Sequence, residues 1–494
     1  MIKRIVSTIV AVAATAAVIF GSQTLGGSPF MLVGDKAGST LTKVKAKELT
    51  LVCPGSVFAT GGASGTNVSA FQRIGTAVAD YSSNLPAGVS LKTLALTGPA
   101  ASRGNATDTS NRVGNLASVN AVAITVADSA GSAVQSSALL TAQSYQVSNT
   151  RGVLGAIGAN CQTPSAESWL VGASSAVGRE ALLVLANPTA TDATVNLQIF
   201  GEQGQIEGAG LSGISVSANR TVVLPLAAFA PVQGSLAVHV TSAGAPLATW
   251  IQERTVRGTL AAGADLVSPS VPANHNLVIP GLFKRGTKDA TTLISGNADY
   301  ADLTPAAQVF VPGAKDATVT VQVIGTDPKS TGTVAQQQIT AGSTANIPLT
   351  GLKDGNYAVF VVADQPVMAA VRLSRTNLAN TPNTDFAWLS AVAPNVGPLV
   401  ITSAKSAISK LSIANPGHTP VVASVTNLTD GGITRITVPQ LGSAVVTVKP
   451  GTVVSVAAAK PLASTLIADF NWLLTAIPLI DYRNSGGWLS VLVR

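Results

Sequence analysis

The chain has 494 residues, of which 46% are hydrophobic and only 11% are charged. This length exceeds what one hydrophobic core usually supports, so we expect several domains of roughly 100 to 150 residues, and the hydrophobic content excludes a disordered chain. The net charge is +7, but residues 1–50 account for +4 of it, and no basic stripe follows. The charge pattern therefore argues against a nucleic-acid partner.

Residues 1–25 have the pattern of a membrane anchor. Lys3 and Arg4 precede an uncharged, mostly apolar run from Ile5 to Gly21, which is at the short end for crossing a bilayer. Because no clear small-x-small cleavage site follows, we expect an uncleaved transmembrane signal anchor with its amino terminus in the cytoplasm; a cleaved signal peptide is the alternative. Residues 26–45 would form a stem. The bulk of this single-pass protein of the cell membrane would then be extracytoplasmic.

The only two cysteines, Cys53 and Cys161, bracket the first predicted β domain, residues 46–166. In an exported protein a lone pair of cysteines most often forms a disulfide, although two buried free thiols are an alternative. Two thiols without a neighbouring histidine do not complete a tetrahedral metal site. Within this domain, short strand patterns alternate with polar loops rich in Gly, Ser and Asn.

The rest of the chain repeats one pattern three times, at residues 167–274, 275–396 and 397–494. Each copy opens with two strands joined near a proline, continues with a short strand, and ends with a long strand pair around a proline turn. The opening prolines are offset by 124 and 104 residues, the size of one β-sandwich. We therefore predict an all-β chain of tandem antiparallel, immunoglobulin-like sandwiches. The opening and turn prolines are Pro188, Pro312 and Pro416, and Pro246, Pro366 and Pro461.

Few residues have the spacing of a catalytic or metal site. The histidines, His239, His275 and His418, fall at non-equivalent positions without a metal-ligand spacing. No GxSxG nucleophile pattern occurs, and the glycine-rich GGASGTN has no phosphate-loop lysine. We therefore predict no catalytic residue, no cofactor and no metal. Four carboxylates near loops cannot be paired at a glycosidase distance from sequence alone: Asp265, Asp299, Asp302 and Asp385.

Tryptophan gives the one signal of a binding surface. Four of the five tryptophans occur in Trp-Leu pairs, and two of these begin the pattern WLxxxxP at the end of a repeat. An exposed indole can stack on a sugar ring, but the favoured interpretation is an aromatic that fills the seam between two sandwiches. Trp250 lies inside a strand pattern and is expected in the core. The paired tryptophans are Trp169, Trp388, Trp472 and Trp488.

Three stretches after the anchor carry a family resemblance: TLVCPG at residues 50–55, GANCQTPSAESWLVG at 158–172 and LVLANPTATDATVNLQIFGEQG at 183–204. Together they resemble an actinobacterial family catalogued as domain of unknown function 5719. That family has no established activity, so the resemblance implies an envelope location and no catalytic residue. Its members are often encoded beside a membrane glycosyltransferase, which implies a context of envelope polysaccharide assembly. The second repeat has Val311 before its opening proline, so Asn-Pro is no strict requirement.

These patterns lead to one expected function and two alternatives. We expect a non-catalytic, membrane-anchored structural or interaction protein of the bacterial cell envelope. Its expected partners are the membrane, through the N-terminal helix, and envelope proteins or polysaccharide, with a membrane glycosyltransferase as a candidate. The first alternative is a glycan-binding accessory protein that assists such a glycosyltransferase. The second is an enzyme with a cleft among the long loops of the first domain.

Overall fold

The computed structural model describes residues 39–43, 48–60, 71–84, 89–97, 103–106, 112–128, 139–150, 152–326, 331–377, 383–482 and 488–492. The chain divides into two compact units, one made of Met1–Lys45 with Gly486–Arg494 and the other of Ala46–Ser485. In the first unit, β1 (Ser39–Lys43) pairs antiparallel with β36 (Trp488–Leu492). The expected anchor and most of the stem lie outside the described residues. In the part that is described, no helix is long and apolar enough to cross a bilayer.

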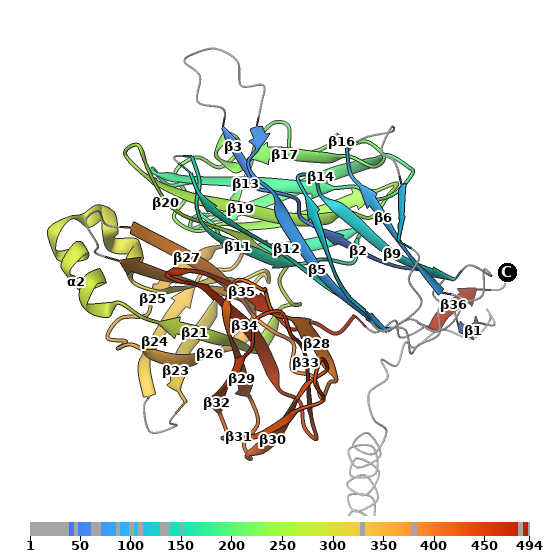
Figure 1. Cartoon of the computed structure of the whole chain (residues 1–494). Helices are drawn as coiled ribbons and strands as arrows, with labels where there is room; N and C mark the ends of the chain where they lie inside the picture. Colours follow the sequence, from blue (N-terminus) through green and yellow to red (C-terminus); the bar gives the residue numbers. More distant parts are fainter. Residues whose placement is uncertain are drawn as a thin grey trace, which may run out of the picture. The chain divides into compact units, whose positions relative to one another are not determined.

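The prediction of an all-β chain built from antiparallel sheets is confirmed (Figure 1). Besides strands, the described residues form α2 (Thr287–Gly296) and the short 3-10 helices η1 (Leu226–Ala228) and η2 (Ala298–Leu303). The many β-branched residues explain this outcome, because their side chains fit a pleated surface better than a helix.

Strand pairing within Ala46–Ser485 falls into four successive stretches, which we call modules 1 to 4. Module 1 (residues 48–160) has two four-stranded sheets and the hairpin of β3 (Phe58–Thr60) with β4 (Phe71–Arg73). One sheet has the order β2 (Glu48–Cys53), β9 (Val122–Asp128), β6 (Val89–Ala95) and β7 (Arg103–Ala106). The other has the order β11 (Leu154–Asn160), β10 (Leu139–Asn149), β5 (Ala77–Asn84) and β8 (Arg112–Ser118).

Module 2 (residues 167–267) and module 4 (residues 399–478) also have two sheets each. In module 2, one sheet has the order β12 (Glu167–Val171), β18 (Ala237–Ala243), β14 (Ala193–Gly201) and β15 (Gly204–Ile206), and β16 (Ile214–Val216) also pairs with β14. The other sheet has the order β17 (Thr221–Pro225), β13 (Arg179–Ala186), β19 (Ala248–Arg257) and β20 (Leu260–Val267). In module 4, one sheet has the order β28 (Leu399–Thr402), β33 (Val453–Ala458), β30 (Val421–Asn427) and β31 (Ile433–Val438). The other sheet has the order β32 (Gly442–Val448), β29 (Ile408–Asn415), β34 (Ala463–Phe470) and β35 (Leu473–Pro478).

In module 3 (residues 274–390) the long strand β26 (Gly355–Asn377) runs through the position where a tight turn was expected. Up to Val367 it pairs with β21 and β23, and from Met368 it pairs with β22 and β27. The expected turn at Pro366 is therefore wrong: the chain passes from one ladder to the other there, and proline has no N–H to give to either. The other strands of this module are β21 (Asn274–Lys284), β22 (Ala306–Phe310), β23 (Ala317–Gly325), β24 (Thr331–Ile339), β25 (Thr344–Pro348) and β27 (Asn383–Ser390).

The Asn-Pro motif that opens two of the repeats marks a corner between sheets. In module 2 the motif joins β13 to β14, which lie in different sheets. The buried Asn187 donates through Nδ2 to the carbonyl oxygens of Thr191 (2.8 Å) and Val216 (3.0 Å), and its Oδ1 accepts from the Thr189 amide. Asn415 makes the corresponding bonds at the β29–β30 corner of module 4. At this corner the backbone leaves the strand ladder, and the asparagine side chain supplies hydrogen bonds to backbone groups that the ladder no longer pairs.

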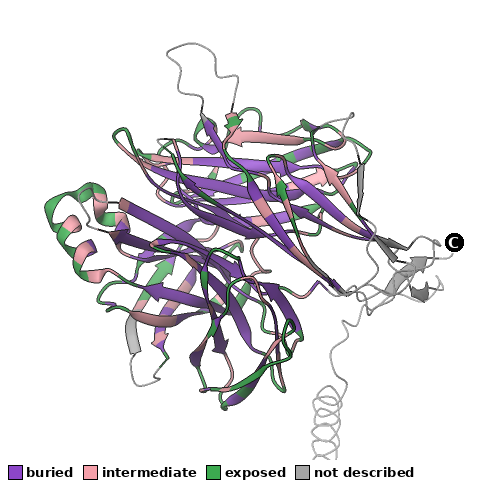
Figure 2. Ribbon diagram, viewed as in Figure 1, coloured by how far each residue is buried: buried purple, intermediate pink, exposed green. Residues whose placement is uncertain are grey.

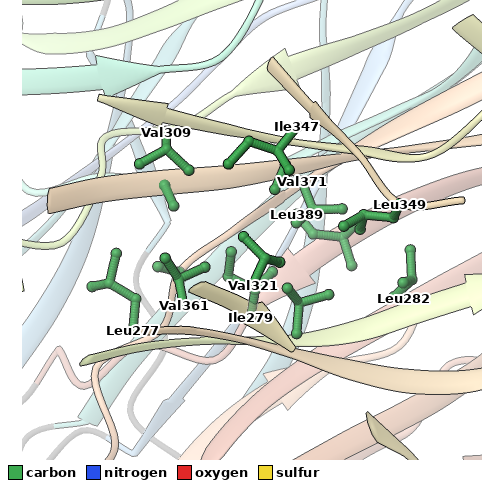
Figure 3. Packing of buried hydrophobic residues seen from close by; sticks show 14 of the residues in the cluster. Leu277, Ile279, Leu282, Val309, Val321, Ile347, Leu349, Val361, Val371 and Leu389 are labelled. Carbon is green, nitrogen blue, oxygen red and sulfur yellow. The ribbon is translucent and has the colours of Figure 1, made fainter. Parts of the chain in front are cut away.

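Buried residues extend along the strands of all four modules (Figure 2), and clusters of buried side chains are shared between neighbouring modules. Figure 3 shows the core of module 3, where side chains from several strands, among them Leu277, Val309 and Ile347, pack together. Ile467 and Leu474 of module 4 belong to the same cluster. A second cluster joins module 2 to module 3 and includes Leu170 and Trp388. A third joins module 1 to module 2 and includes Ile157 and Trp250. A fourth joins module 1 to module 4 and includes Tyr145 and Phe470. The contacts therefore form a closed ring of four modules.

One edge strand of each module lies on the inside of this ring, and we call β11, β20, β27 and β35 the inner strands. Both β11 and β27 contact β20 and β35, and they also contact each other. Gly155 in β11 has a φ of +150°, and a Cβ built there would lie 2.8 Å from the backbone nitrogen of Ala264 in β20. The inner strands therefore approach too closely for a side chain at this position.

Candidate functional site

Two buried carboxylates hold the inner strands together. Asp265 of β20 accepts hydrogen bonds from the Trp388 amide (2.8 Å), the Gly158 amide (3.1 Å) and the Thr475 hydroxyl (3.1 Å). Asp385 of β27 accepts from the amides of Ala156 (3.2 Å) and Leu474 (2.9 Å). Edge strands have amide groups that no neighbouring strand pairs with. From modules 2 and 3, the two carboxylates satisfy such groups in modules 1, 3 and 4.

Burial changes the acidity of both groups. The loss of solvation raises the pKa of Asp385 to about 7, against the lowering effect of the amides that it binds. Burial also raises the pKa of Asp265 well above its ordinary value, although the amides of Trp388 and Gly158 oppose this. Because their bound partners are neighbouring strands, these carboxylates have a structural role in joining the modules.

A cavity of about 950 Å³ lies where the four inner strands end, and we call it the mouth cavity. Its walls include the last residues of β11, β27 and β35 and the segments that follow all four inner strands, namely residues 160–163, 268–273, 390–393 and 478–482. All four modules therefore contribute to one concave surface. Such a surface, lined by apolar groups with a few polar ones, is the usual form of a ligand site.

A disulfide and two hydrogen bonds fix the frame of the mouth cavity. Cys53 and Cys161 form the predicted disulfide, which ties β2 to the segment after β11. The Tyr482 hydroxyl donates to the carbonyl oxygen of Cys161 (2.7 Å), and Asn160 donates through Nδ2 to the carbonyl oxygen of Pro478. Burial raises the pKa of Tyr482 far above its ordinary value, so this phenol remains a donor. The frame therefore joins modules 1 and 4.

Trp169 forms the aromatic part of the wall. Its indole is half-buried, and the imidazole of His239 is stacked on it with ring centroids 3.9 Å apart and 5° between the planes. The imidazole is fixed by Glu167 (Nε2 to Oε1, 2.9 Å) and by Gln198 (Nδ1 to Oε1, 2.8 Å). Phe310 packs against the same indole. Trp169 is therefore held rigidly in the cavity wall by His239 and Phe310, which stack on its indole.

Three serine hydroxyls supply polar groups to the same wall. Ser168, Ser268 and Ser390 line the cavity and are only 9%, 8% and 8% exposed. Among the described residues none of these hydroxyls has a hydrogen-bond partner. A nearly buried hydroxyl usually has such a partner, and each of these can both donate and accept. The three hydroxyls are therefore available to a ligand.

The charges of the wall have one sign. Glu167 and Asp481 line the mouth cavity, and no arginine or lysine does so among the described residues. The carboxylate of Asp481 accepts from Asn395 (3.1 Å), and that of Glu167 is paired with His239. An anionic ligand would meet like charge here and no guanidinium or ammonium group to bind it.

The predicted tryptophans lie in different environments. Trp388 is only 2% exposed, donates through Nε1 to Glu253 Oε2 (2.9 Å) and packs in the core of module 2, so its indole is not available to a ligand. Trp472 is partly buried against the cluster shared by modules 1 and 4. The side chain of Trp488 lies outside the described residues. Trp250 is fully buried, as expected.

Asp302, one of the loop carboxylates, belongs to an ion-pair cluster between modules 2 and 3. It is paired with Arg179 (2.5 Å), Arg257 (2.7 Å) and Arg372 (3.2 Å). Burial alone would raise the pKa of Asp302, but the three arginines outweigh it and lower the pKa to about 2. The backbone carbonyl of Asp299 accepts from Arg257. The carboxylate of Asp302 is thus paired within the protein and is not open to a ligand.

Neither His275 nor His418 lies at the mouth cavity. His275 contacts the carbonyl oxygen of Ala363 through Nδ1 (3.1 Å), and His418 lies in the exposed corner after Asn415. Within the described residues, no group of three His, Cys, Asp or Glu side chains could hold a metal ion.

The sequence did not single out the three serines, although a signal was present. Ser268 and Ser390 both stand four residues before a proline at the end of a repeat, Pro272 and Pro394. The WLxxxxP pattern includes Ser390, but it drew attention to the tryptophan. The role of these serines depends on the ring, which brings together segments more than 100 residues apart.

Comparison with known proteins places this chain in a family. A search among curated proteins finds no match. A family model described as a family of unknown function, DUF5719, matches residues 113–459, which span all four modules. The match covers well over half of the 494 residues, and the chain is therefore a member of the DUF5719 family.

Proposed function

We propose that this protein is a non-catalytic interaction protein of the bacterial cell envelope, anchored in the membrane, which binds its partner in the mouth cavity. The observation that carries this proposal is the set of three unpartnered serine hydroxyls in a cavity framed by all four modules. A preformed concave site with a few convergent polar groups is typical of binding.

The location outside the cytoplasm is supported by two features. The disulfide of Cys53 with Cys161 is of a kind that persists in oxidising compartments and is rare in the cytosol. The apolar run from Ile5 to Gly21 has the pattern of a signal anchor, and we assign it as the membrane helix. An immunoglobulin-like character of the sandwich modules is part of the same proposal.

The non-catalytic role is supported by the environment of the strongly perturbed acids. Asp265 and Asp385 are at most 1% exposed and bind amides of neighbouring strands. A catalytic acid must reach the proton that it transfers. These two carboxylates instead join modules.

Photo-crosslinking from inside the mouth cavity tests this proposal. Ser270 and Ile480 line the cavity without being among the three unpartnered serines, so each is replaced by p-benzoylphenylalanine in the full chain and irradiated in native envelopes. We expect a shifted adduct from both positions. Val177, which is 92% exposed and lies outside the cavity, is the matched control and should give none. Equal adducts at all three positions, or adducts at Val177 alone, would contradict the proposal.

A glycan-binding accessory protein for a membrane glycosyltransferase is the second candidate. The observation that favours it is Trp169, whose indole lines the cavity and is held by His239. The adducts separate the two candidates: a protein adduct digested by protease favours the interaction protein, and an adduct removed by periodate oxidation favours the glycan-binding protein.

A further inference from the structure

A second cavity adjoins the mouth cavity along the seam of modules 1 and 2. Its volume is about 610 Å³, and Leu49 and Thr163 line both cavities. Thr163 is exposed, and its hydroxyl has no hydrogen-bond partner among the described residues. The two cavities therefore adjoin at Leu49 and Thr163, and we call the pair the double cavity.

The walls of the second cavity are rich in hydroxyl groups and rigid rings. Lys92 is the one charged residue among the described residues that line it. Most hydroxyls of this wall are already bound within the protein: Thr50 bonds Thr125 (2.9 Å), and Thr189 bonds Asn187 and Thr191. The hydroxyl of Thr163 is open and can donate to, or accept from, a ligand that carries hydroxyls of its own. The threonines and prolines of this wall are Thr50, Thr93, Thr125, Thr163 and Thr189, and Pro164, Pro188 and Pro246.

Charge and backbone pairing restrict the class of ligand. Glu167 and Asp481 disfavour a polyanion in the mouth cavity, as described above. An extended peptide binds such seams by adding to a strand edge, which requires unpaired backbone groups. At the mouth, the edge of β2 is closed by mutual backbone bonds of Val52 and Gln162 (2.7 and 2.8 Å), and the Trp169 carbonyl accepts from the Ser270 amide (2.7 Å). The closed strand edges therefore disfavour a peptide, and the acidic residues disfavour a polyanion. An uncharged, hydroxyl-rich chain fits both observations.

We infer that the double cavity binds one extended, uncharged saccharide chain, with one sugar at the hydroxyls of Ser168, Ser268 and Ser390 and later sugars passing Thr163 into the second cavity. The inference rests on the proposed binding role of the mouth cavity. The inference adds the chemical class of the ligand and its length, because the mouth cavity and the second cavity together can bind a longer chain than the mouth cavity alone.

Calorimetric titration with neutral oligosaccharides tests the inference. The probes are α-1,4, α-1,6, β-1,3 and β-1,4 linked hexose series of two to ten units, added to the detergent-solubilised full chain. For at least one series we expect the association constant to rise about 10-fold or more with length and then to level off. The double change Ser268→Ala with Ser390→Ala, which removes two of the unpartnered hydroxyls, should weaken every length about 10-fold or more.

Variants at the junction separate length from simple binding. Thr163→Leu removes the hydroxyl and adds bulk at the point where the two cavities meet, so the association constant should no longer rise with chain length. Thr194→Leu, at an exposed threonine of β14 outside both cavities, is the control and should change neither.

Several results would overturn the inference. These are the absence of binding by every series, an affinity that does not depend on length, an unchanged length dependence in Thr163→Leu, or tighter binding of polyphosphate or polyglutamate than of any neutral chain. If photo-crosslinking at Ser270 captures a partner while no saccharide binds, the proposed binding role stands and only the saccharide inference fails.

Discussion

At the scale of single residues, the buried carboxylates are the least expected feature of a chain with so few charges. Asp265 and Asp385 were visible in the sequence only as acids near loops, and nothing in their local pattern indicates a partner. Their donors come from β11, β27 and β35, which are remote in sequence. Burying an acid is costly unless hydrogen bonds offset the lost solvation. Their burial is therefore understandable only once the ring is known.

Asp385 should make the stability of the protein depend on pH. Burial raises its pKa to about 7 from an ordinary value of 3.8, so the folded state holds the proton more tightly than the unfolded state. Its contribution to stability is complete below pH 3.8 and is lost as the pH rises through about 7. The asparagine in Asp385→Asn cannot ionise. The free energy of unfolding of this variant, relative to that of the parent, should therefore rise by up to about 4 kcal/mol between pH 4 and pH 8.

Urea unfolding of the Asp385→Asn variant and the parent at several pH values measures this gain. Glu207→Gln, at an exposed carboxylate, is the matched control and should keep the pH dependence of the parent. A parent protein whose stability relative to Asp385→Asn rises from pH 4 to pH 8 would show that the sign is wrong.

At the scale of elements, the sequence predicted the strands better than their partners. Alternation and proline punctuation indicated antiparallel strands, and the Asn-Pro motif lies at the corner between two strands in modules 2 and 4. The turn at Pro366 was wrong, because a proline signal is the same whether the chain reverses or moves to another sheet. The contacts of β11 with β20, β27 and β35 could not be predicted, because side chains join these strand edges and no ladder of backbone hydrogen bonds does so.

Gly155 tests how closely the inner strands approach. Its φ of +150° and the 2.8 Å distance from a built Cβ to the Ala264 backbone leave no room for a methyl group. Gly155→Ala should therefore lower the free energy of unfolding by about 2 kcal/mol or more. Gly296→Ala, at the end of α2 where nothing lies within 4 Å of a built Cβ, is the control and should change stability by less than about 1 kcal/mol. Equal effects in denaturant unfolding would contradict the close approach.

At the scale of the whole molecule, the hydrophobic cores are continuous between modules. A chain of sandwiches was predicted from the repeat, and the repeat does not specify how neighbouring copies pack. The shared clusters place Trp388 of module 3 in the core of module 2 and Leu474 of module 4 in the core of module 3. The cavity follows from this packing, because it is lined by the segments after all four inner strands.

The disulfide should stabilise the ring at its mouth. Cys53 and Cys161 are 108 residues apart, and linking them restricts the unfolded chain by about 4 to 5 kcal/mol in the loop-entropy model. The double change Cys53→Ser with Cys161→Ser should lower the unfolding free energy by up to that amount, measured by guanidinium unfolding. The parent protein under reducing conditions is the control and should lose a similar amount. A loss below about 1 kcal/mol would show that the bridge does not restrain this structure.

Amide hydrogen exchange read by mass spectrometry tests the central claim most directly, which is that four edge strands are joined into one ring. The measurement compares peptides from β11, β20, β27 and β35 with β19, a central strand, and with β31, an edge strand whose residues are mostly exposed. The account predicts that all four inner strands exchange as slowly as β19, because they pack against one another and because Asp265 and Asp385 bind amides of β11, β27 and β35. Exchange of the inner strands as fast as that of β31 would contradict it.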